Sequence, residues 1–188
     1  MRASRFAAYI VNAVVLALVL APAADAQSTG GATYEKSSQK VQRSLSFLGP
    51  KAEIRKDGLA VAPVGAPREV IAAIASANKI VGKPYRYGGG HAKVEDTGYD
   101  CSGTISYALI GAKLLKAPLD SGSFMRWGEA GPGEWITVYT NPGHAYVVIA
   151  GLRLDTSAAG DPSGRKGPRW RPALRSARGF TARHPEGL

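Results

Sequence analysis

Cys101 is the one cysteine of this chain, so its thiol cannot form a disulfide within the chain. It serves packing, pairing with another chain, or chemistry. Asp100 precedes it and an apolar run follows, which predicts a helix that begins at Cys101 with Asp100 as its capping residue. The free amide groups of a first helical turn favour a thiolate and can donate hydrogen bonds to an oxyanion. These features indicate a nucleophile, and the alternative is a small buried structural residue.

A cysteine nucleophile needs an imidazole nearby, and the chain has three histidines, His91, His144 and His184. His144 directly follows an Asn-Pro-Gly turn and opens a β-branched run, which places it at the start of a predicted strand. A helix packed on a sheet can bring Cys101 and His144 together. His91 lies in a glycine-rich stretch, where we expect a solvent-exposed loop residue, with substrate contact as the alternative.

Asp155 is the group that we expect to orient the His144 ring. A two-residue bend between the two strands places Asp155 opposite Tyr146, on the strand face that His144 shares. A three-residue bend places Thr156 there instead. A carboxylate in this position holds the ring and stabilises the imidazolium. Two alternatives stay open, that Asp155 is a surface acid and that His184 orients the ring.

The order of helical and strand patterns along the chain predicts an α+β fold, in which helices come first and an antiparallel sheet follows. An apolar stripe at helical spacing predicts one helix from Pro67 to about Val81, and a second runs from Cys101 to about Leu115. Alternating and β-branched runs predict strands, with the segment 170–178 ambiguous. The predicted strands are 135–140, 144–150, 152–156 and 179–184.

The first 26 residues are typical of a signal peptide, because a positive start and an apolar run precede Ala24-Asp25-Ala26. An uncleaved membrane anchor over 6–24 is the alternative. We expect a weakly ordered leader over residues 27–65. Residues 66–188 are expected to form a single domain. We therefore expect a protein secreted to the cell wall or periplasm, with no membrane span after cleavage.

The formal net charge of +10 favours contact with anionic surfaces, and a basic surface kept for solubility is the alternative. The region from residue 161 to the end is rich in Lys and Arg around Trp170, and could bind anionic wall polymers. No nucleic-acid-binding spacing is present. The histidines and the cysteine lack zinc-ligand spacing, and no phosphate-binding loop is found, so we expect no metal and no cofactor.

Three segments resemble, in order and spacing, the NlpC-type family of cell-wall endopeptidases: 84–89 (PYRYGG), 99–103 (YDCSG) and Gly143-His144. The resemblance covers roughly residues 67–157. It implies a papain-like domain whose N-terminal helices pack on a central antiparallel sheet. It also implies hydrolysis of amide bonds in peptidoglycan stem peptides, commonly the γ-D-glutamyl bond to a diamino acid.

The resemblance also implies roles for single residues. Cys101 matches the nucleophile and His144 the base, and Tyr85 matches a tyrosine that lines the site and helps to hold the oxyanion. Asp100 and Ser102 match residues that recognise the free amine end of the stem peptide in some members.

This chain departs from the family at the third catalytic position, where members usually carry His, Asn or Gln and Asp155 is expected here. That departure keeps two alternatives open, a catalytically impaired wall-binding module of the same fold and another papain-like amidase or acyltransferase. In each case we expect a monomer whose partner is the peptidoglycan stem peptide.

Overall fold

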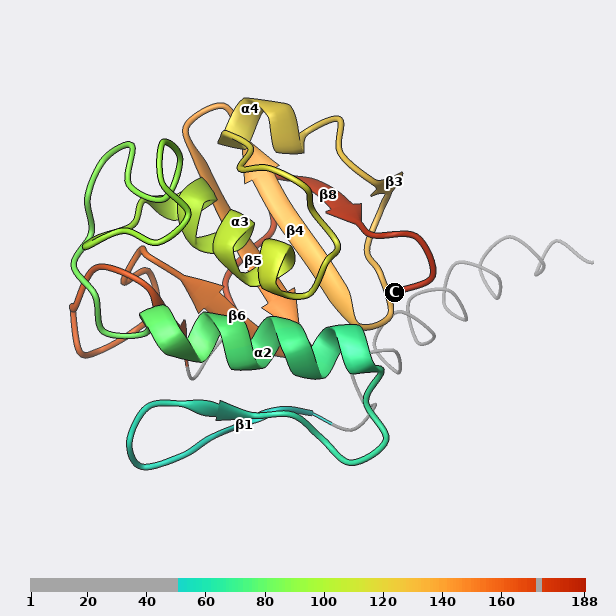
Figure 1. Ribbon diagram of the computed structural model, residues 1–188, viewed down its shortest axis with the longest axis horizontal. Helices are drawn as coiled ribbons and strands as arrows, with labels where there is room; N and C mark the ends of the chain where they lie inside the picture. Colours follow the sequence, from blue (N-terminus) through green and yellow to red (C-terminus); the bar gives the residue numbers. More distant parts are fainter. Residues whose placement is uncertain (1–50, 172–173) are drawn as a thin grey trace, which may run out of the picture.

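The computed structural model describes residues 51–171 and 174–188, which form an α+β unit around one six-stranded sheet (Figure 1). Neighbouring strands of this sheet all run antiparallel, so the predicted α+β class with an antiparallel sheet is confirmed. The predicted signal peptide lies outside the described residues. In spatial order the strands are β3 (Glu129–Ala130), β8 (Thr181–His184), β4 (Ile136–Asn141), β5 (His144–Ile149), β6 (Leu152–Asp155) and β7 (Arg169–Arg171).

Helix α2 (Arg68–Ile80) forms within the predicted bounds. Pro67 precedes its first turn, where a missing N–H costs nothing, and Gly82 ends the segment at φ 88°. Its apolar stripe faces the core: Val70, Ile74 and other side chains of that stripe are buried, as helical spacing predicts.

Helix α3 (Cys101–Gly111) carries the cysteine in its first turn, and the Asp100 side chain accepts a hydrogen bond from the Gly103 amide at 2.7 Å. The predicted cap is therefore confirmed. The helix ends four residues before the predicted Leu115, because Lys113 takes a left-handed conformation (φ 60°). Gly111 permits close helix packing, since a Cβ there would lie 1.9 Å from the Ser76 hydroxyl of α2.

Two tight turns fix the register of the central strands. Asn141 pairs with His144 across the Pro142-Gly143 turn, and its side chain accepts from the His144 amide at 2.8 Å. Ala150 and Gly151 form the next bend with φ of 45° and 72°, the signs of a two-residue hairpin turn. The pairs that follow this bend have the predicted register: Ile149 with Leu152, Val148 with Arg153 and Val147 with Leu154.

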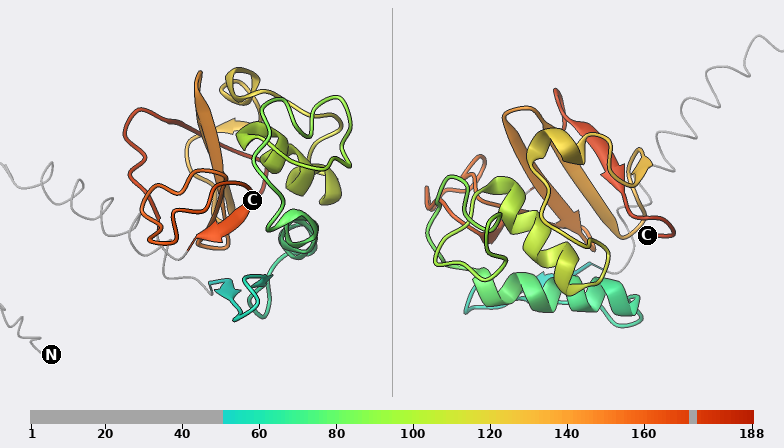
Figure 2. Two further views of the ribbon diagram at one scale, coloured as in Figure 1. Left: turned by 90° about the vertical axis from the view of Figure 1, so that its left-hand side faces the viewer. Right: turned by 45° about the horizontal axis from the view of Figure 1, so that its top comes forward.

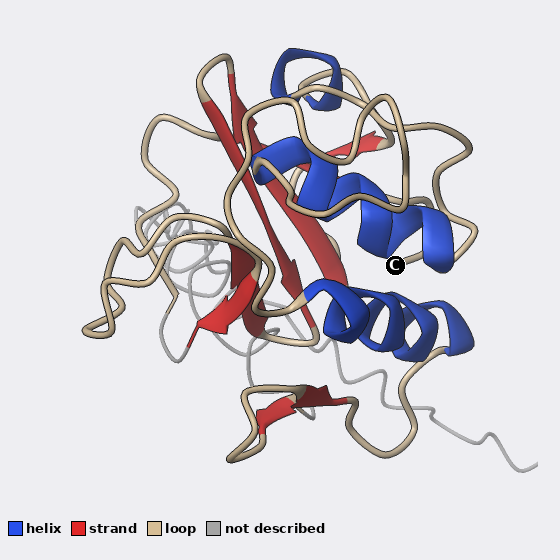
Figure 3. Ribbon diagram, turned by 60° about the vertical axis from the view of Figure 1, so that its left-hand side comes forward, coloured by secondary structure: helices blue, strands red, loops and turns tan. Residues whose placement is uncertain are grey.

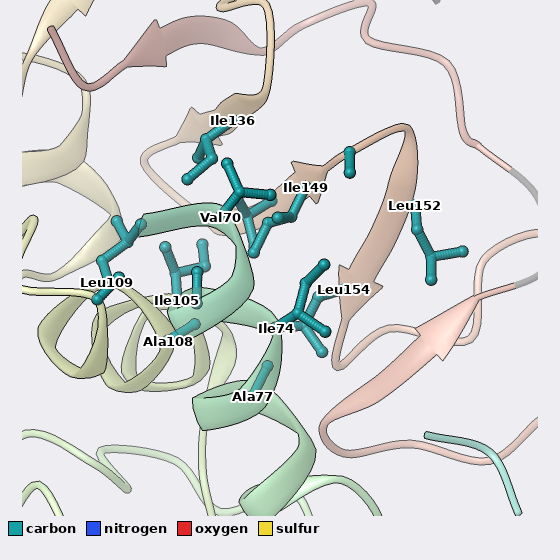
Figure 4. Packing of buried hydrophobic residues seen from close by; sticks show 14 of the residues in the cluster. Val70, Ile74, Ala77, Ile105, Ala108, Leu109, Ile136, Ile149, Leu152 and Leu154 are labelled. Carbon is teal, nitrogen blue, oxygen red and sulfur yellow. The ribbon is translucent and has the colours of Figure 1, made fainter. Parts of the chain in front are cut away.

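The two longer helices cover one face of the sheet, and side chains from both layers fill the core (Figures 2 and 4). The core side chains labelled in Figure 4 come from α2, α3, β4, β5 and β6: Val70, Ile74, Ala77, Ile105, Ala108, Leu109, Ile136, Ile149, Leu152 and Leu154. A second apolar cluster lies apart from this core. It contains Tyr139, Tyr146 and Val148, with Phe180 and Ala182 packed against them.

A small hairpin of β1 (Glu53–Ile54) and β2 (Ala60–Val61) lies beside α2 (Figure 3). The Asn78 side chain of α2 accepts from the Ala60 amide at 2.9 Å and donates to the Ala60 carbonyl at 2.8 Å. Residues 51–65, which the sequence assigned to the leader, thus include a hairpin bonded to the domain, and residues before 51 lie outside the described part. A short helix α4 (Ser121–Phe124) precedes β3. Within 51–171 and 174–188, no helix is both long and apolar enough to cross a membrane.

Candidate active site

Cys101 is partly exposed and is the first residue of α3, so it lies at the partially positive N-terminal end of that helix. Burial by itself raises the pKa of the thiol. Hydrogen bonds from the His144 ring and the Ala145 amide, together with the charge of His144, outweigh burial, so the pKa of Cys101 lies below its ordinary value. A thiol with a depressed pKa is a stronger nucleophile near neutral pH.

His144 is the first residue of β5, and its ring lies between a thiol and a carboxylate. Its Nε2 lies 3.0 Å from Asp155 Oδ1, so Nδ1 is the ring nitrogen left for Cys101. Burial alone lowers the pKa of the imidazole, but the hydrogen bonds to Asp155 and Cys101 raise it to about 9. Opposite shifts in two neighbouring groups favour a thiolate beside an imidazolium.

Asp155 ends β6, and its side chain is fully buried. Besides His144, it accepts a hydrogen bond from the Ser157 amide at 2.8 Å and one from Arg175 Nη1 at 3.3 Å. The Ser157 bond is to Oδ1 and the Arg175 bond is to Oδ2, and Arg153 Nε lies 3.8 Å from Oδ2 as well. The hydrogen bonds from Arg175 and the Ser157 amide, with Arg153 nearby, fix the orientation of this carboxylate toward the ring.

The other two candidates for the third position lie differently. Thr156 is buried next to Asp155, but the two-residue bend gives Asp155 the strand face of His144. His184 lies on β8, two strands from β5, where Nδ1 is 3.0 Å from the Gly131 carbonyl and Nε2 is 3.1 Å from Glu129. The tertiary structure therefore brings Asp155, and not His184, to His144.

An open cleft of about 420 Å³ leads to the thiol. Tyr85 lines it and is 44% exposed. Burial, followed by the nearby Cys101 and Asp100, raises the pKa of the Tyr85 hydroxyl, which therefore stays a hydrogen-bond donor at neutral pH. Asp100 and Ser102 also line the cleft, but both are buried, at 7% and 4% exposure. Among the described residues, no group of three or more His, Cys, Asp or Glu is placed to hold a metal.

Comparison with known proteins relates this chain to endopeptidases, although no protein-family model matches it. It is 31% identical over 108 residues to a probable endopeptidase of Mycobacterium tuberculosis, a match that covers 54% of this chain. A probable endopeptidase of Mycobacterium bovis matches to the same extent. These matched relatives are named as endopeptidases, the class of enzyme that the sequence resemblance implies. It spans 27% of the length of these curated relatives.

Among solved structures, the chain is similar to the peptidoglycan hydrolase RipB from Mycobacterium tuberculosis. The TM-score is 0.46 at 22% identity, and the match covers 85% of this chain and 87% of that one.

His91 lies in a loop, as predicted, but this loop forms part of the cleft wall and the side chain is only partly exposed. Its side chain is 25% exposed, and Nε2 lies 3.0 Å from Asp100 Oδ1 and 3.2 Å from Ser102 Oγ. The preceding glycines let this loop fold back tightly, since a Cβ at Gly90 would lie 2.6 Å from the Tyr99 ring. The position of this imidazole directly after three glycines and shortly before the cysteine motif is the sequence feature that agrees with its place in the cleft wall.

Arg175 is a residue near the site that the sequence did not assign a role to. It bonds Asp155 from an irregular segment, and its guanidinium lies 5.3 Å from the Tyr146 ring centre and 5.2 Å from that of Phe180. No periodic pattern around it could have assigned it to the site. The cation stacks on two rings of the second apolar cluster while it bonds the carboxylate.

Other cations of the basic C-terminal region also make internal contacts. Arg171 is fully buried and bonds Asp161 at 2.5 Å, while Arg183 Nε donates to the Trp127 carbonyl at 2.6 Å. Trp170 is buried in the core, and its indole N–H donates to Asn78 at 2.8 Å. Part of this charge therefore stabilises the fold and is not available to an external polymer.

Proposed function

We propose that this chain is a secreted cysteine peptidase of papain-like architecture that hydrolyses amide bonds in peptidoglycan stem peptides. The observation that carries the proposal is the series of contacts from Asp155 through His144 to Cys101. These contacts raise the pKa of the His144 ring and lower the pKa of the Cys101 thiol. Its relation to endopeptidases supports the class of reaction. Export is proposed from the predicted signal peptide, which lies outside the described residues.

In the proposed reaction, the Cys101 thiolate attacks the carbonyl carbon of the scissile amide. The oxyanion that forms accepts hydrogen bonds from the Cys101 amide and the Tyr85 hydroxyl. His144 gives its proton to the leaving amine nitrogen, the C–N bond breaks, and a thioester remains on Cys101. Asp155 holds the ring in place and stabilises its protonated form throughout.

Water then completes the cycle. Neutral His144 accepts a proton from water as the oxygen attacks the thioester carbon. The carboxylic acid product leaves, and the thiolate and imidazolium form again. General acid–base catalysis of this kind contributes roughly 10²–10⁴ in rate. The γ-D-glutamyl bond to the diamino acid is the bond that we propose is cut.

The test uses mature wild-type protein and its Cys101→Ala variant with defined muropeptides, followed by mass spectrometry of the products. We expect the wild type to release two peptide fragments and the variant to lose about 10⁴-fold or more in rate. Cleavage by the variant at the wild-type rate contradicts the proposal. If neither protein cuts while both sediment with wall material, the chain is a wall-binding module. An acyl group transferred to an added amine instead of water indicates an acyltransferase.

A further inference from the structure

A second pocket lies outside the active-site cleft. It has a volume of about 350 Å³ and lies where the β1–β2 turn, the end of α2, the loop 161–165 and β7 meet. Four charged residues are among those that line it: Asp57, Asp161, Arg165 and Arg169. None of them takes part in the proposed reaction, so the pocket raises a separate question of function.

Both acids of this pocket are already matched by arginines that do not line it. Asp161 forms an ion pair with the fully buried Arg171, and this hydrogen bond at 2.5 Å lowers the pKa of Asp161 to about 2. Asp57 pairs with Arg55 and also accepts from the Leu59 amide at 3.0 Å. The negative charges of the pocket are therefore balanced within the chain.

The two arginines of the pocket have no such match. No side-chain hydrogen bond or ion pair joins Arg165 or Arg169 to another residue within 51–171 and 174–188. The Nε atom of Arg169 is buried in addition, and has no hydrogen-bond partner in this part of the chain. A buried donor without an acceptor costs free energy, and an anion bound beside it would supply the acceptor.

Arg171 also holds the loop that carries Arg165. Its Nη1 donates to the Arg165 carbonyl at 2.9 Å and its Nη2 to the Gly167 carbonyl at 3.3 Å. The Gly167 amide in turn donates to the Thr156 carbonyl of the neighbouring segment at 3.0 Å. A loop that is ordered before a ligand arrives loses less conformational entropy on binding, which favours a site over a flexible charged surface.

The two unmatched guanidiniums give the pocket two positive charges. The C-terminal end of α2 also reaches it, but this end contributes only about half of a negative elementary charge. A guanidinium presents paired N–H donors in one plane, a geometry that fits the oxygens of a phosphate group. We propose that this pocket binds a phosphodiester group of an anionic wall polymer. A polymer repeats its charged group, so it is also attracted by the net charge of +10.

The pocket lies close to the active-site cleft. Gly82 lines the pocket and Tyr85 lines the cleft, and three residues of chain span at most about 10 Å. Gly167 packs against the chain between them, since a Cβ there would lie 3.1 Å from the Tyr85 nitrogen. A polymer bound in the pocket would keep the cleft next to wall material. This inference rests on the proposed export to the wall and not on catalysis.

The test titrates the mature protein with poly(glycerol phosphate) at low ionic strength and measures the affinity by calorimetry. We expect Arg169→Gln to weaken binding about tenfold, the factor of one hydrogen bond to a charged group. The matched control is Arg178→Gln, which removes the same charge from an exposed residue outside the pocket and is expected to change the affinity less than twofold. If melting shows that Arg169→Gln does not fold, the exposed Arg165→Gln gives the same comparison.

Two results would overturn the inference. An equal loss of affinity in Arg178→Gln would show attraction by net charge without a site. Equal affinity for poly-L-glutamate, with the same dependence on Arg169, would assign the pocket to carboxylates instead of phosphodiesters. We expect Arg169→Gln to keep the wild-type kcat/KM for muropeptides that carry no polymer. If no Cys101-dependent cleavage is found, the proposed reaction fails, but the binding measurement still decides this inference.

Discussion

Two histidine–carboxylate pairs lie near Cys101, and both have Nε2···Oδ1 distances of 3.0 Å. They differ in the partner of the second nitrogen of each ring. His144 has Asp155 at one nitrogen and the thiol as its other partner, and both raise its pKa. His91 has its two polar neighbours, Asp100 and Ser102, at the same nitrogen. Equal distances therefore give unequal chemistry, because the second nitrogen decides whether a ring can exchange a proton with the nucleophile.

The carboxylates differ as well. Asp155 is completely buried and is bonded by Arg175 and the Ser157 amide, with Arg153 close by. Asp100 caps a helix and is bonded by backbone amides, a hydroxyl and His91. The Asp155 contacts hold a negative charge next to the His144 ring, which carries the proton. The Asp100 contacts fix the helix start that carries the cysteine.

Removing Asp155 is expected to cause the largest difference between the two pairs. We expect Asp155→Ala to lower kcat about a hundredfold and Asp155→Asn about tenfold, because the amide oxygen still accepts from Nε2–H. The neutral amide also removes the charge that raises the pKa of His144, so the alkaline limb of the pH–rate profile moves down from about 9. The matched Asp100→Asn variant keeps its cap and is expected to lose less than tenfold. An alkaline limb unchanged in Asp155→Asn contradicts the assigned role.

Alkylation of Cys101 sharpens the comparison without needing a substrate. The lowered pKa of the thiol predicts rapid iodoacetamide labelling below neutral pH, which declines as acid protonates the thiolate. We expect His144→Ala to slow labelling at pH 6 at least tenfold, and His91→Gln to leave it unchanged. A midpoint of wild-type labelling near roughly pH 8.5, the pKa of an ordinary thiol, would contradict the proposed ion pair.

Arg175→Met is expected to have the smallest effect. Methionine keeps apolar contact with Tyr146 and Phe180 but removes the cation that bonds Asp155. We expect kcat to fall two- to threefold, which corresponds to an activation barrier higher by roughly 0.5 kcal/mol. Loss of a nearby cation favours the imidazolium, so the alkaline limb rises by less than about one pH unit, opposite in direction to Asp155→Asn. Equal shifts in the two variants would show that Arg175 does not act through Asp155.

The parts of the fold and site that depend on neighbouring residues follow from the sequence. The helix start at Asp100 and Cys101 follows from capping. Strand parity favours Asp155 over Thr156 if the bend has two residues, and the turn at Ala150 and Gly151 has two. The end of α3 was misplaced because a left-handed Lys113 stops the helix, which no local residue preference indicates.

The sequence by itself determined which groups can react and which strand face each shares, because helix caps, hairpin length and side-chain alternation are properties of neighbouring residues. Only the tertiary structure decided that His91 covers Asp100 and that Arg175 bonds Asp155. Both residues lie in irregular segments, where no helical or strand repeat relates a residue's position in the sequence to the direction of its side chain. Their partners are set by how loops fold over the sheet and helix, and that depends on packing across the whole domain.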